Sequence, residues 1–226
     1  MSTATAQLVF DANFIVGLSD NELENLKVEL NYGHVILNTG LGTANLDGYI
    51  GIVPNPTITG KIYNWTITGL SLNSYYYFDV RVNNVIEKRY YINTADARTF
   101  HSLIVTVTDA QWLQNGLPNA ELEGATVEVS EDDGATLPRW FDHLQLTGMT
   151  DPVTPADLFV FLTTPQANPI FNTITSATGR VLIQGLVNGE WEIEVSKAGK
   201  VTRVGVVNFT GNTPTVVARR YSLEDV

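Results

Sequence analysis

The sequence predicts an all-β protein made of two tandem β-sandwich domains. Short runs rich in Val, Thr, Tyr and Phe alternate with many of the 18 glycines and 9 prolines, a mixture typical of many short strands. The runs recur at intervals of about 8 to 12 residues with turn residues between them, as in sandwich folds. A chain of 226 residues with 44% hydrophobic and 16% charged residues can bury two cores.

Residues 1–96 are expected to form the first domain. Two of its expected strands flank Asn83-Asn84, and asparagine tolerates the positive φ of a tight turn, so a hairpin is expected there. The expected strands are those where apolar and polar residues alternate: 6–10, 14–18, 26–30, 34–37, 49–53, 61–67, 75–82 and 85–92.

The segment from Trp65 to Val82 resembles the E and F strands of fibronectin type III domains, which are immunoglobulin-like sandwiches. In that family a leucine precedes a turn, and a tyrosine six residues later opens the next strand. Leu70 and Tyr76 occupy these positions. The resemblance implies that Tyr76 is a corner tyrosine, whose hydroxyl ties its strand to the upstream connection. The strand B tryptophan of the family is absent, and Leu30 lies near its place.

Residues 97–226 are expected to form the second domain, after a polar boundary at 93–99. An insertion at 131–157 interrupts it, and Pro138 to Leu144 predicts a short helix there, because proline suits the first turn of a helix. The expected strands are 103–109, 124–130, 158–162, 180–184, 190–195, 202–209 and 214–221.

The stretch from Thr175 to Lys200 predicts a β-hairpin. Apolar residues alternate on both sides of a turn at 187–190, which contains Asn-Gly. The residues predicted to lie in the core are Val181, Ile183, Leu186, Trp191, Ile193 and Val195.

The same stretch resembles the carboxypeptidase regulatory-like domains, prealbumin-like β-sandwiches close to the Cna-B surface modules. Their signature T-D-x-x-G-x-F-x-I-x-G-L-x-x-G-x-Y-x-I-x-V corresponds to Thr175 through Val195, with Trp191 in the tyrosine position. The resemblance implies a stalk, spacer or adhesion unit without catalysis. Cna-B-type modules often carry a lysine–asparagine isopeptide bond. The strand expected at 103–109 contains no lysine, so this bond is not expected here.

Charge and composition exclude several classes of function. The net charge of −11 repels phosphate backbones, so nucleic-acid binding is not expected. The absence of cysteine excludes disulfides, thiolate metal sites and a cysteine nucleophile. The N-terminal residues lack the pattern of a signal peptide, and no apolar run is long enough to cross a membrane. We therefore expect synthesis in the cytoplasm without secretion and no membrane partner.

The sequence offers little chemistry. The histidines His34, His101 and His143 have no ligand spacing and are expected at the surface or at strand edges. Residues 131–134 read Glu-Asp-Asp-Gly, which lacks the alternating ligands of a calcium loop and predicts a solvated turn. No nucleophile elbow, phosphate-binding loop or carboxylate pair is recognisable. We expect no catalytic residue, no metal, no cofactor and no enzymatic activity.

Aromatic and apolar residues are the candidate partner contacts. Those in the insertion either anchor a partner, since aromatic side chains dominate interfaces, or fold back over the end of the sandwich. The tyrosines of the Tyr-Tyr-Tyr-Phe run that share one strand face either stack on a sugar or a protein, or pack across strands. The candidates are Trp112, Trp140, Phe141, Leu144, Tyr75 and Tyr77.

Surface-type sandwiches in a cysteine-free chain without an export signal predict a non-enzymatic virion structural protein of a tailed bacteriophage. Such a protein is an auxiliary or decoration capsid protein, or a neck or tail accessory subunit, made in the host cytoplasm. Its expected partners are other virion proteins in a multi-copy assembly, with a host surface glycan as a further candidate. The alternative is a bacterial cell-surface adhesion or carbohydrate-binding module.

Overall fold

The computed structural model describes residues 3–14, 26–35, 44–53, 56–72, 74–94, 98–115, 120–131, 140–142 and 169–226. Strands make up most of these residues, and the helices within them are the single turn η1 (Ala12–Phe14) and the short α2 (Ala110–Gln114). The predicted all-β class is confirmed. Neither of these helices is long and apolar enough to span a membrane.

Two sheets make up the first pair, and their inner faces enclose one hydrophobic cluster. One sheet has the order β1–β5–β4 and the other the order β10–β7–β6–β2–β3. Large aromatic residues such as Phe10, Trp65 and Phe78 are fully buried between them. The strand bounds are β1 (Thr3–Asp11), β2 (Lys27–Val35), β3 (Ala44–Ile52), β4 (Thr57–Thr59), β5 (Ile62–Ser71), β6 (Tyr75–Val82) and β7 (Val85–Asn93).

The turn chemistry of the first half agrees with its sequence. Asn83 and Asn84 have φ values of 50° and 65° between β6 and β7, which pair as the predicted hairpin. The Tyr76 hydroxyl accepts a hydrogen bond from the backbone N–H of Ser71 at 2.9 Å, so the predicted corner tyrosine is confirmed. The strands expected at 26–30 and 34–37 are one strand, β2, as far as Val35. The short β4 was not expected.

The second pair consists of a four-stranded sheet, β11–β9–β13–β14, and a three-stranded sheet, β12–β8–β15. β15 runs parallel to β8, whereas the other pairings are antiparallel. Trp191, Phe171 and Phe209 fill the core between the two sheets. The bounds are β8 (His101–Asp109), β9 (Thr126–Glu131), β11 (Phe171–Ile174), β12 (Arg180–Leu186), β13 (Gly189–Ser196), β14 (Arg203–Phe209) and β15 (Val216–Leu223). The strand β10 (Trp140–Asp142) belongs to the five-stranded sheet of the first pair.

The predicted hairpin from Thr175 to Lys200 is wrong in its pairing. β12 pairs with β8 in one sheet, whereas β13 pairs with β9 and β14 in the other. The connection between them therefore crosses from one layer of the sandwich to the other, with Gly185 and Gly189 at positive φ on either side. All six core residues predicted there are buried, because they face one another across the layers instead of lying side by side on one sheet.

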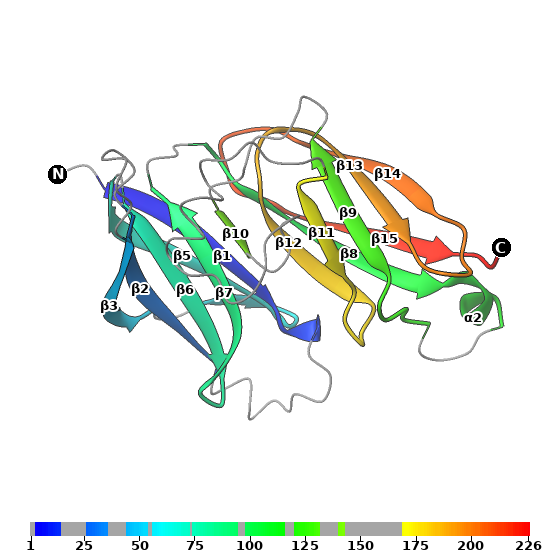
Figure 1. Cartoon of the computed structure of the whole chain (residues 1–226), viewed down its shortest axis with the longest axis horizontal. Coiled ribbons are helices and arrows are strands. Elements are labelled where there is room, and N and C mark those ends of the chain that lie inside the picture. The colour runs from blue at the N-terminus through cyan, green and yellow to red at the C-terminus, as the bar shows by residue number, and fades with distance from the viewer. Residues whose placement is uncertain are drawn as a thin grey trace.

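The two pairs lie side by side along the long axis of the molecule, with the N-terminus at the first and the C-terminus at the second (Figure 1). β10, from the expected insertion, forms an edge strand beside β7 of the first pair and also lies next to β12 (Figure 1). The helix predicted from Pro138 to Leu144 is therefore wrong at 140–142, where three residues pair in a strand. The division of the chain at residue 96 stays a prediction, as do the strands expected at 14–18 and 158–162, which fall largely or wholly outside the described ranges.

Candidate functional site: the junction between the sheet pairs

The junction between the two sheet pairs begins with β12, a strand that is buried on both faces. Its inward residues Val181 and Ile183 belong to the second core, and Leu182 and Gln184 on its outward face are only 6% and 0% exposed. A strand covered on both faces reads as a nearly continuous apolar run, as Val-Leu-Ile does here. The outward face is covered by β1, the edge strand of the first pair.

An edge strand presents a row of unpaired backbone groups, and Gln184 satisfies two of them on β1. The backbone N–H of Val9 donates to Gln184 Oε1 at 3.0 Å, and Gln184 Nε2 donates to the Val9 carbonyl at 2.9 Å. The side-chain amide therefore pairs with β1 as the peptide of a neighbouring strand would. Beside this pair Val9, Ile104 and Leu182 form a separate hydrophobic cluster, against which Ile62 packs.

A salt bridge between Arg180 and Asp11 also joins β12 to β1, near the end of β1. Arg180 Nη2 and Nε donate to Asp11 Oδ2 at 2.6 and 3.0 Å, and the Asp11 side chain is only 1% exposed. The second carboxylate oxygen accepts hydrogen bonds from the backbone and side chain of Asn13. Because a buried carboxylate is costly without partners, this arrangement holds the end of β1 against the start of β12.

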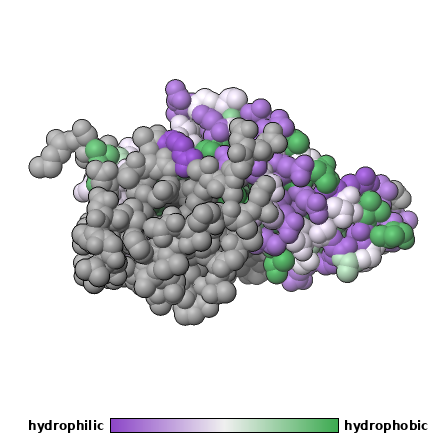
Figure 2. Space-filling view, turned by 45° about the horizontal axis from the view of Figure 1, so that its top comes forward, coloured by the Kyte–Doolittle hydropathy of each residue, from purple (hydrophilic) through white to green (hydrophobic). Residues whose placement is uncertain are grey.

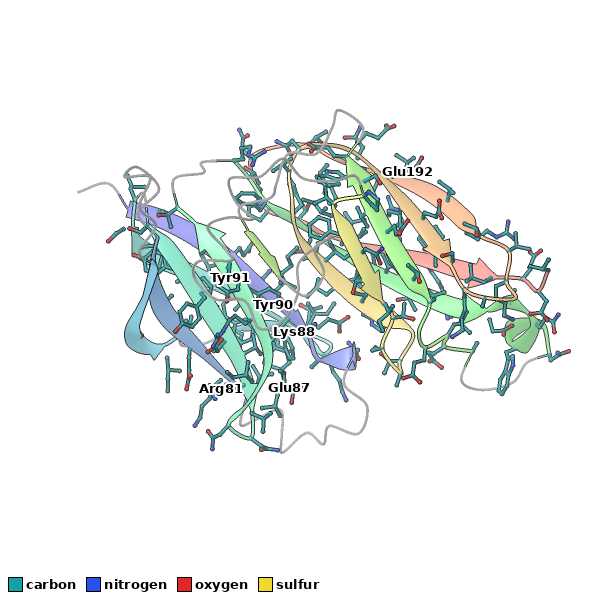
Figure 3. All side chains as sticks on the ribbon, viewed as in Figure 1. Arg81, Glu87, Lys88, Tyr90, Tyr91 and Glu192 are labelled. Atoms are coloured by element: carbon teal, nitrogen blue, oxygen red, sulfur yellow. The ribbon has the colours of Figure 1, made fainter. Side chains whose placement is uncertain are left out.

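The outer face of β6 and β7 also contacts the second pair. Tyr91 is 5% exposed and belongs to the second core cluster, against which Tyr77 and Phe100 also pack. The Tyr77 and Tyr91 rings are 6.2 Å apart, and the guanidinium of Arg89 lies 4.6 Å from the centre of the Tyr77 ring. Figure 3 shows Tyr90 and Tyr91 as neighbours on β7. Burial raises the pKa of Tyr77 and Tyr91 above the ordinary value.

Arg89 also forms two hydrogen bonds, of 2.6 and 2.8 Å, to the carboxylate of Asp79. Asp79 is 2% exposed although it lies on the outer face of its sheet, and its hydrogen bond raises the pKa of Arg89 well above the usual range. Tyr77 is therefore half-buried within a packed layer.

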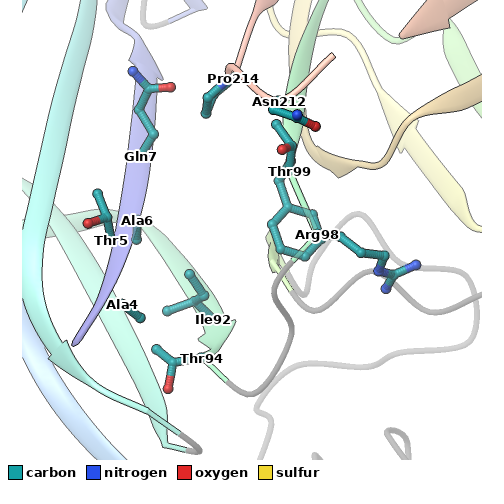
Figure 4. A pocket seen from close by; sticks show the side chains of 11 residues that line it. Ala4, Thr5, Ala6, Gln7, Ile92, Thr94, Arg98, Thr99, Asn212 and Pro214 are labelled. Carbon is teal, nitrogen blue, oxygen red and sulfur yellow. The ribbon is translucent and has the colours of Figure 1, made fainter. Parts of the chain in front are cut away.

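A cleft of about 270 Å³ lies at the upper end of the junction (Figure 4). One wall is the start of β1, from Ala4 to Gln7, and the other includes Thr99, Asn212 and Pro214. Among its described lining residues the one charged side chain is Arg98, whose guanidinium carbon lies 5.9 Å from the centre of the Phe100 ring. These residues do not form a convergent set of buried polar groups of the kind that fixes a small ligand.

The remaining predicted contact residues do not come together. Trp112 lies on α2 at the far end of the second pair and is 47% exposed. Tyr75 lies on β6, and Trp140 and Phe141 lie on β10 opposite Ile92 and Tyr91; the side chains of these three, and all of Leu144, fall outside what the structure describes. The use of these six residues as partner contacts stays a prediction.

The expectation that His101 lies at the surface or at a strand edge is wrong, because it is buried at the start of β8, the central strand of its sheet. The ring is 1% exposed and stacks on Phe209 with centroids 4.8 Å apart. Its Nδ1 accepts a hydrogen bond from the backbone N–H of Thr215, and its Nε2 lies 2.9 Å from Asn188 Oδ1. These contacts assign the proton to Nε2. The ring joins two loops to the start of β8, and its Nδ1 also lies 2.9 Å from the hydroxyl oxygen of Thr215.

No group of three or more His, Asp or Glu residues that could hold a metal ion occurs within the described ranges. Of the acidic turn at 131–134, only Glu131 lies in those ranges, at the end of β9. His34 lies on β2, whereas His143 is outside the described part. The junction residues that the sequence did not single out are Val9, Asp11, Arg180 and Gln184.

Comparison with known proteins places this chain in no family. No family model matches it, and no curated protein matches it. Among solved structures, the shaft pilin SpaA of Lactobacillus rhamnosus GG is 12% identical, with a match over 100% of this chain and 98% of the pilin at a TM-score of 0.33. The Bacillus anthracis TIE protein is 11% identical, at a TM-score of 0.34, over 88% of this chain and 31% of that protein.

A third solved structure is an enzyme. Acinetobacter radioresistens catechol 1,2-dioxygenase is 12% identical over 58% of this chain and 54% of its own, with a TM-score of 0.32. With TM-scores below 0.5, none of these likenesses carries an argument about function. This chain spans less than a third of the TIE protein and about half of the dioxygenase.

Proposed function

We propose that this chain is a non-enzymatic structural and adhesion unit of a bacterial cell surface, which works in multi-copy assemblies through contacts with other protein subunits. The observation that carries the proposal is the junction. Gln184 and Arg180 on one sheet pair bind Val9 and Asp11 on the other through buried or half-buried groups. Two sandwiches joined in this way keep a fixed spacing and orientation, which a stalk or spacer requires.

The resemblance of residues 175–195 to carboxypeptidase regulatory-like and Cna-B modules supports the same role, since those modules serve as stalks, spacers and adhesion units. The bacteriophage virion expected from the sequence finds no support in the geometry or in the comparisons. It remains the other location that the experiment must distinguish.

The test is to locate the protein on intact particles and cells. We expect antibodies against the purified chain to label the outside of intact cells that carry its gene, with a strain lacking the gene as the control. Gold particles seen only after the cells are permeabilised would contradict the surface role. Label and mass-spectrometric peptides on purified phage particles, with none on intact cells, would favour the virion instead.

A further inference from the structure

Two surfaces of the second sheet pair have opposite charge, and neither is covered by another part of the chain that the structure describes. The first, which we call the acidic face, is the outer face of the three neighbouring strands β9, β13 and β14. Cross-strand register places Glu194 between Glu128 and Val204, and Glu192 beside Val206. Figure 3 shows Glu192 on this outer side of the molecule.

The negative charges of the acidic face repel one another in an isolated copy. Glu128 and Glu194 are directly opposite each other on neighbouring strands, where like charges destabilise a sheet. Within the described residues, Glu128, Glu192 and Glu194 form no ion pair. Glu128 Oε1 accepts a hydrogen bond of 2.9 Å from Asn172 Nδ2. Val204 and Val206 beside them are 56% and 48% exposed.

The second surface, which we call the basic edge, is β15, the edge strand of the other sheet. Arg219 and Arg220 are both exposed, and neither forms an ion pair within the described part of the chain. Val216, which is 39% exposed, and Ala218 precede them on the same free edge. Arg219 and Arg220 are consecutive on β15, so their side chains point to opposite faces of the sheet. Together they place positive charge along this free edge, opposite in sign to the glutamates of the acidic face.

Nearby charges are already in use, so they do not neutralise either surface. Arg203 pairs with Glu224 at 2.7 Å, and Lys200 bridges Asp109 and Asp225. Figure 2 shows hydrophobic residues scattered among hydrophilic ones over the described surface of this half. Isolated valines of this kind are ordinary, and the signal lies in their combination with unpaired charges of opposite sign on two surfaces.

We propose that the acidic face of one copy binds the basic edge of a second copy of this chain. The partner is inferred from charge complementarity. Among the described residues, the glutamates of the acidic face and the arginines of the basic edge form no ion pairs, and both surfaces belong to the same sheet pair. Because the two surfaces differ, the contact is heterologous, so each copy keeps one free surface and the association is open-ended. This inference deepens the proposed multi-copy role and rests on it, although it is tested in solution, independently of where the protein is found.

The experiment is sedimentation velocity on the full chain over a series of concentrations. One variant, Glu192→Gln with Glu194→Gln, neutralises the acidic face, and another, Arg219→Gln with Arg220→Gln, neutralises the basic edge. We expect the wild-type chain to form dimers and longer species as its concentration rises, and each variant to associate about tenfold more weakly. Glu121→Gln with Glu123→Gln is the matched control, because it removes the same charge from exposed residues elsewhere.

Mixing the two variants separates this geometry from general stickiness. Each variant keeps the surface that the other has lost, so a mixture should form a one-to-one dimer and stop there. Neutralising two glutamates also reduces repulsion between chains of net charge −11, so non-specific association would become stronger in the first variant, not weaker. Wild-type chains that stay monomeric at the highest concentration, or variants that associate as the wild type does, would overturn the inference. Neither result would bear on the cell-surface location.

Discussion

The junction makes a quantitative prediction about Gln184. Replacing it with alanine removes both hydrogen bonds to Val9 and leaves the N–H and the carbonyl of an edge strand buried without partners. Each unsatisfied buried group costs about 1 to 3 kcal/mol. Two such groups predict a loss of about 2 to 6 kcal/mol in the free energy of unfolding, at the lower end where water enters the space left by the amide.

Urea denaturation followed by far-ultraviolet circular dichroism measures this loss. The core of each sheet pair contains a buried tryptophan, Trp65 in the first and Trp191 in the second, so fluorescence reports on both. If the junction couples the pairs, Gln184→Ala should also separate their unfolding into two transitions. Gln111→Ala is the control, because this glutamine is exposed on α2, and it should change stability by less than about 0.5 kcal/mol.

The result that would refute the reasoning is a Gln184→Ala chain within about 0.5 kcal/mol of the wild type, which is the range of a neutral surface change. In that case the amide would be no more than a passive neighbour of β1. A second variant, Arg180→Ala, tests the same interface without touching Gln184. It leaves the Asp11 carboxylate buried and without its cation, which should cost about 3 to 5 kcal/mol.

Three further predictions concern single positions. Gly179→Ala should lower the free energy of unfolding by more than about 2 kcal/mol in urea titrations, because Gly179 has a φ of +66° and a Cβ there would lie 2.5 Å from the backbone oxygen of Val107. Gly199→Ala is the comparison: its φ is also positive but the space around it is open, so it should lose only about 1 kcal/mol. Tyr76→Phe should lose about 1 kcal/mol, since its hydroxyl accepts a backbone hydrogen bond, and an unchanged urea midpoint would contradict the corner role. Hydrogen bonding to Lys200 lowers the pKa of Asp109 below its ordinary value of 3.8. The ionised Asp109 therefore stabilises the fold at neutral pH, and this stabilisation is lost as the pH falls through the lowered pKa. Asp109→Asn should make the free energy of unfolding depend less on pH on the acid side, and a curve parallel to that of the wild type would refute this.

The strands and the inward residues of this fold were readable from alternation, whereas strand partners were not. Val181 and Ile183 were correctly predicted as core, because alternation identifies which side chains share a face. It does not tell whether the next strand lies beside β12 or across from it. The apolar Leu182 between them indicated that both faces of β12 are covered, since a strand with one face in solvent would place a polar residue there.

The error at His101 has a similar cause. His101 shares its strand face with Leu103, Val105 and Val107, which are all in the second core, so the period of two already placed it inside. A lone histidine carries no ligand spacing, and reading it by chemistry instead of by position led to the surface expectation. The partners that make its burial tolerable, Thr215 and Asn188, lie far away in the sequence and gave no local signal.

Strand β10 shows where local propensity fails. A proline followed by Arg-Trp-Phe favours a helix start, yet residues 140–142 pair with Tyr90, Tyr91 and Ile92. A free edge of a sheet is available to any segment that can reach it, and tertiary context decides strand formation more than intrinsic preference does. The junction was missed for the same reason, because no pattern near Gln184 refers to a strand 175 residues away.

The sheet edges β1, β14 and β15 differ in how they are covered, and this difference connects the junction with the proposed assembly. The free edge of β1 is covered within the chain, by an amide that imitates a neighbouring strand and a salt bridge that seals one end. The edges β14 and β15 end the two sheets of the second pair, and along them Val204, Val206 and Val216 stay exposed. Among the described residues, Gln184 covers the edge of β1 within the chain, whereas these valines along β14 and β15 are exposed, where we propose the contact between copies. If the acidic face and the basic edge serve self-association, neutralising their charges should leave the free energy of unfolding unchanged or slightly higher, since it also relieves the repulsion between Glu128 and Glu194. Removing the contacts of β1 should lower the free energy of unfolding. The reverse pattern would show that the assignment of the two contacts is wrong.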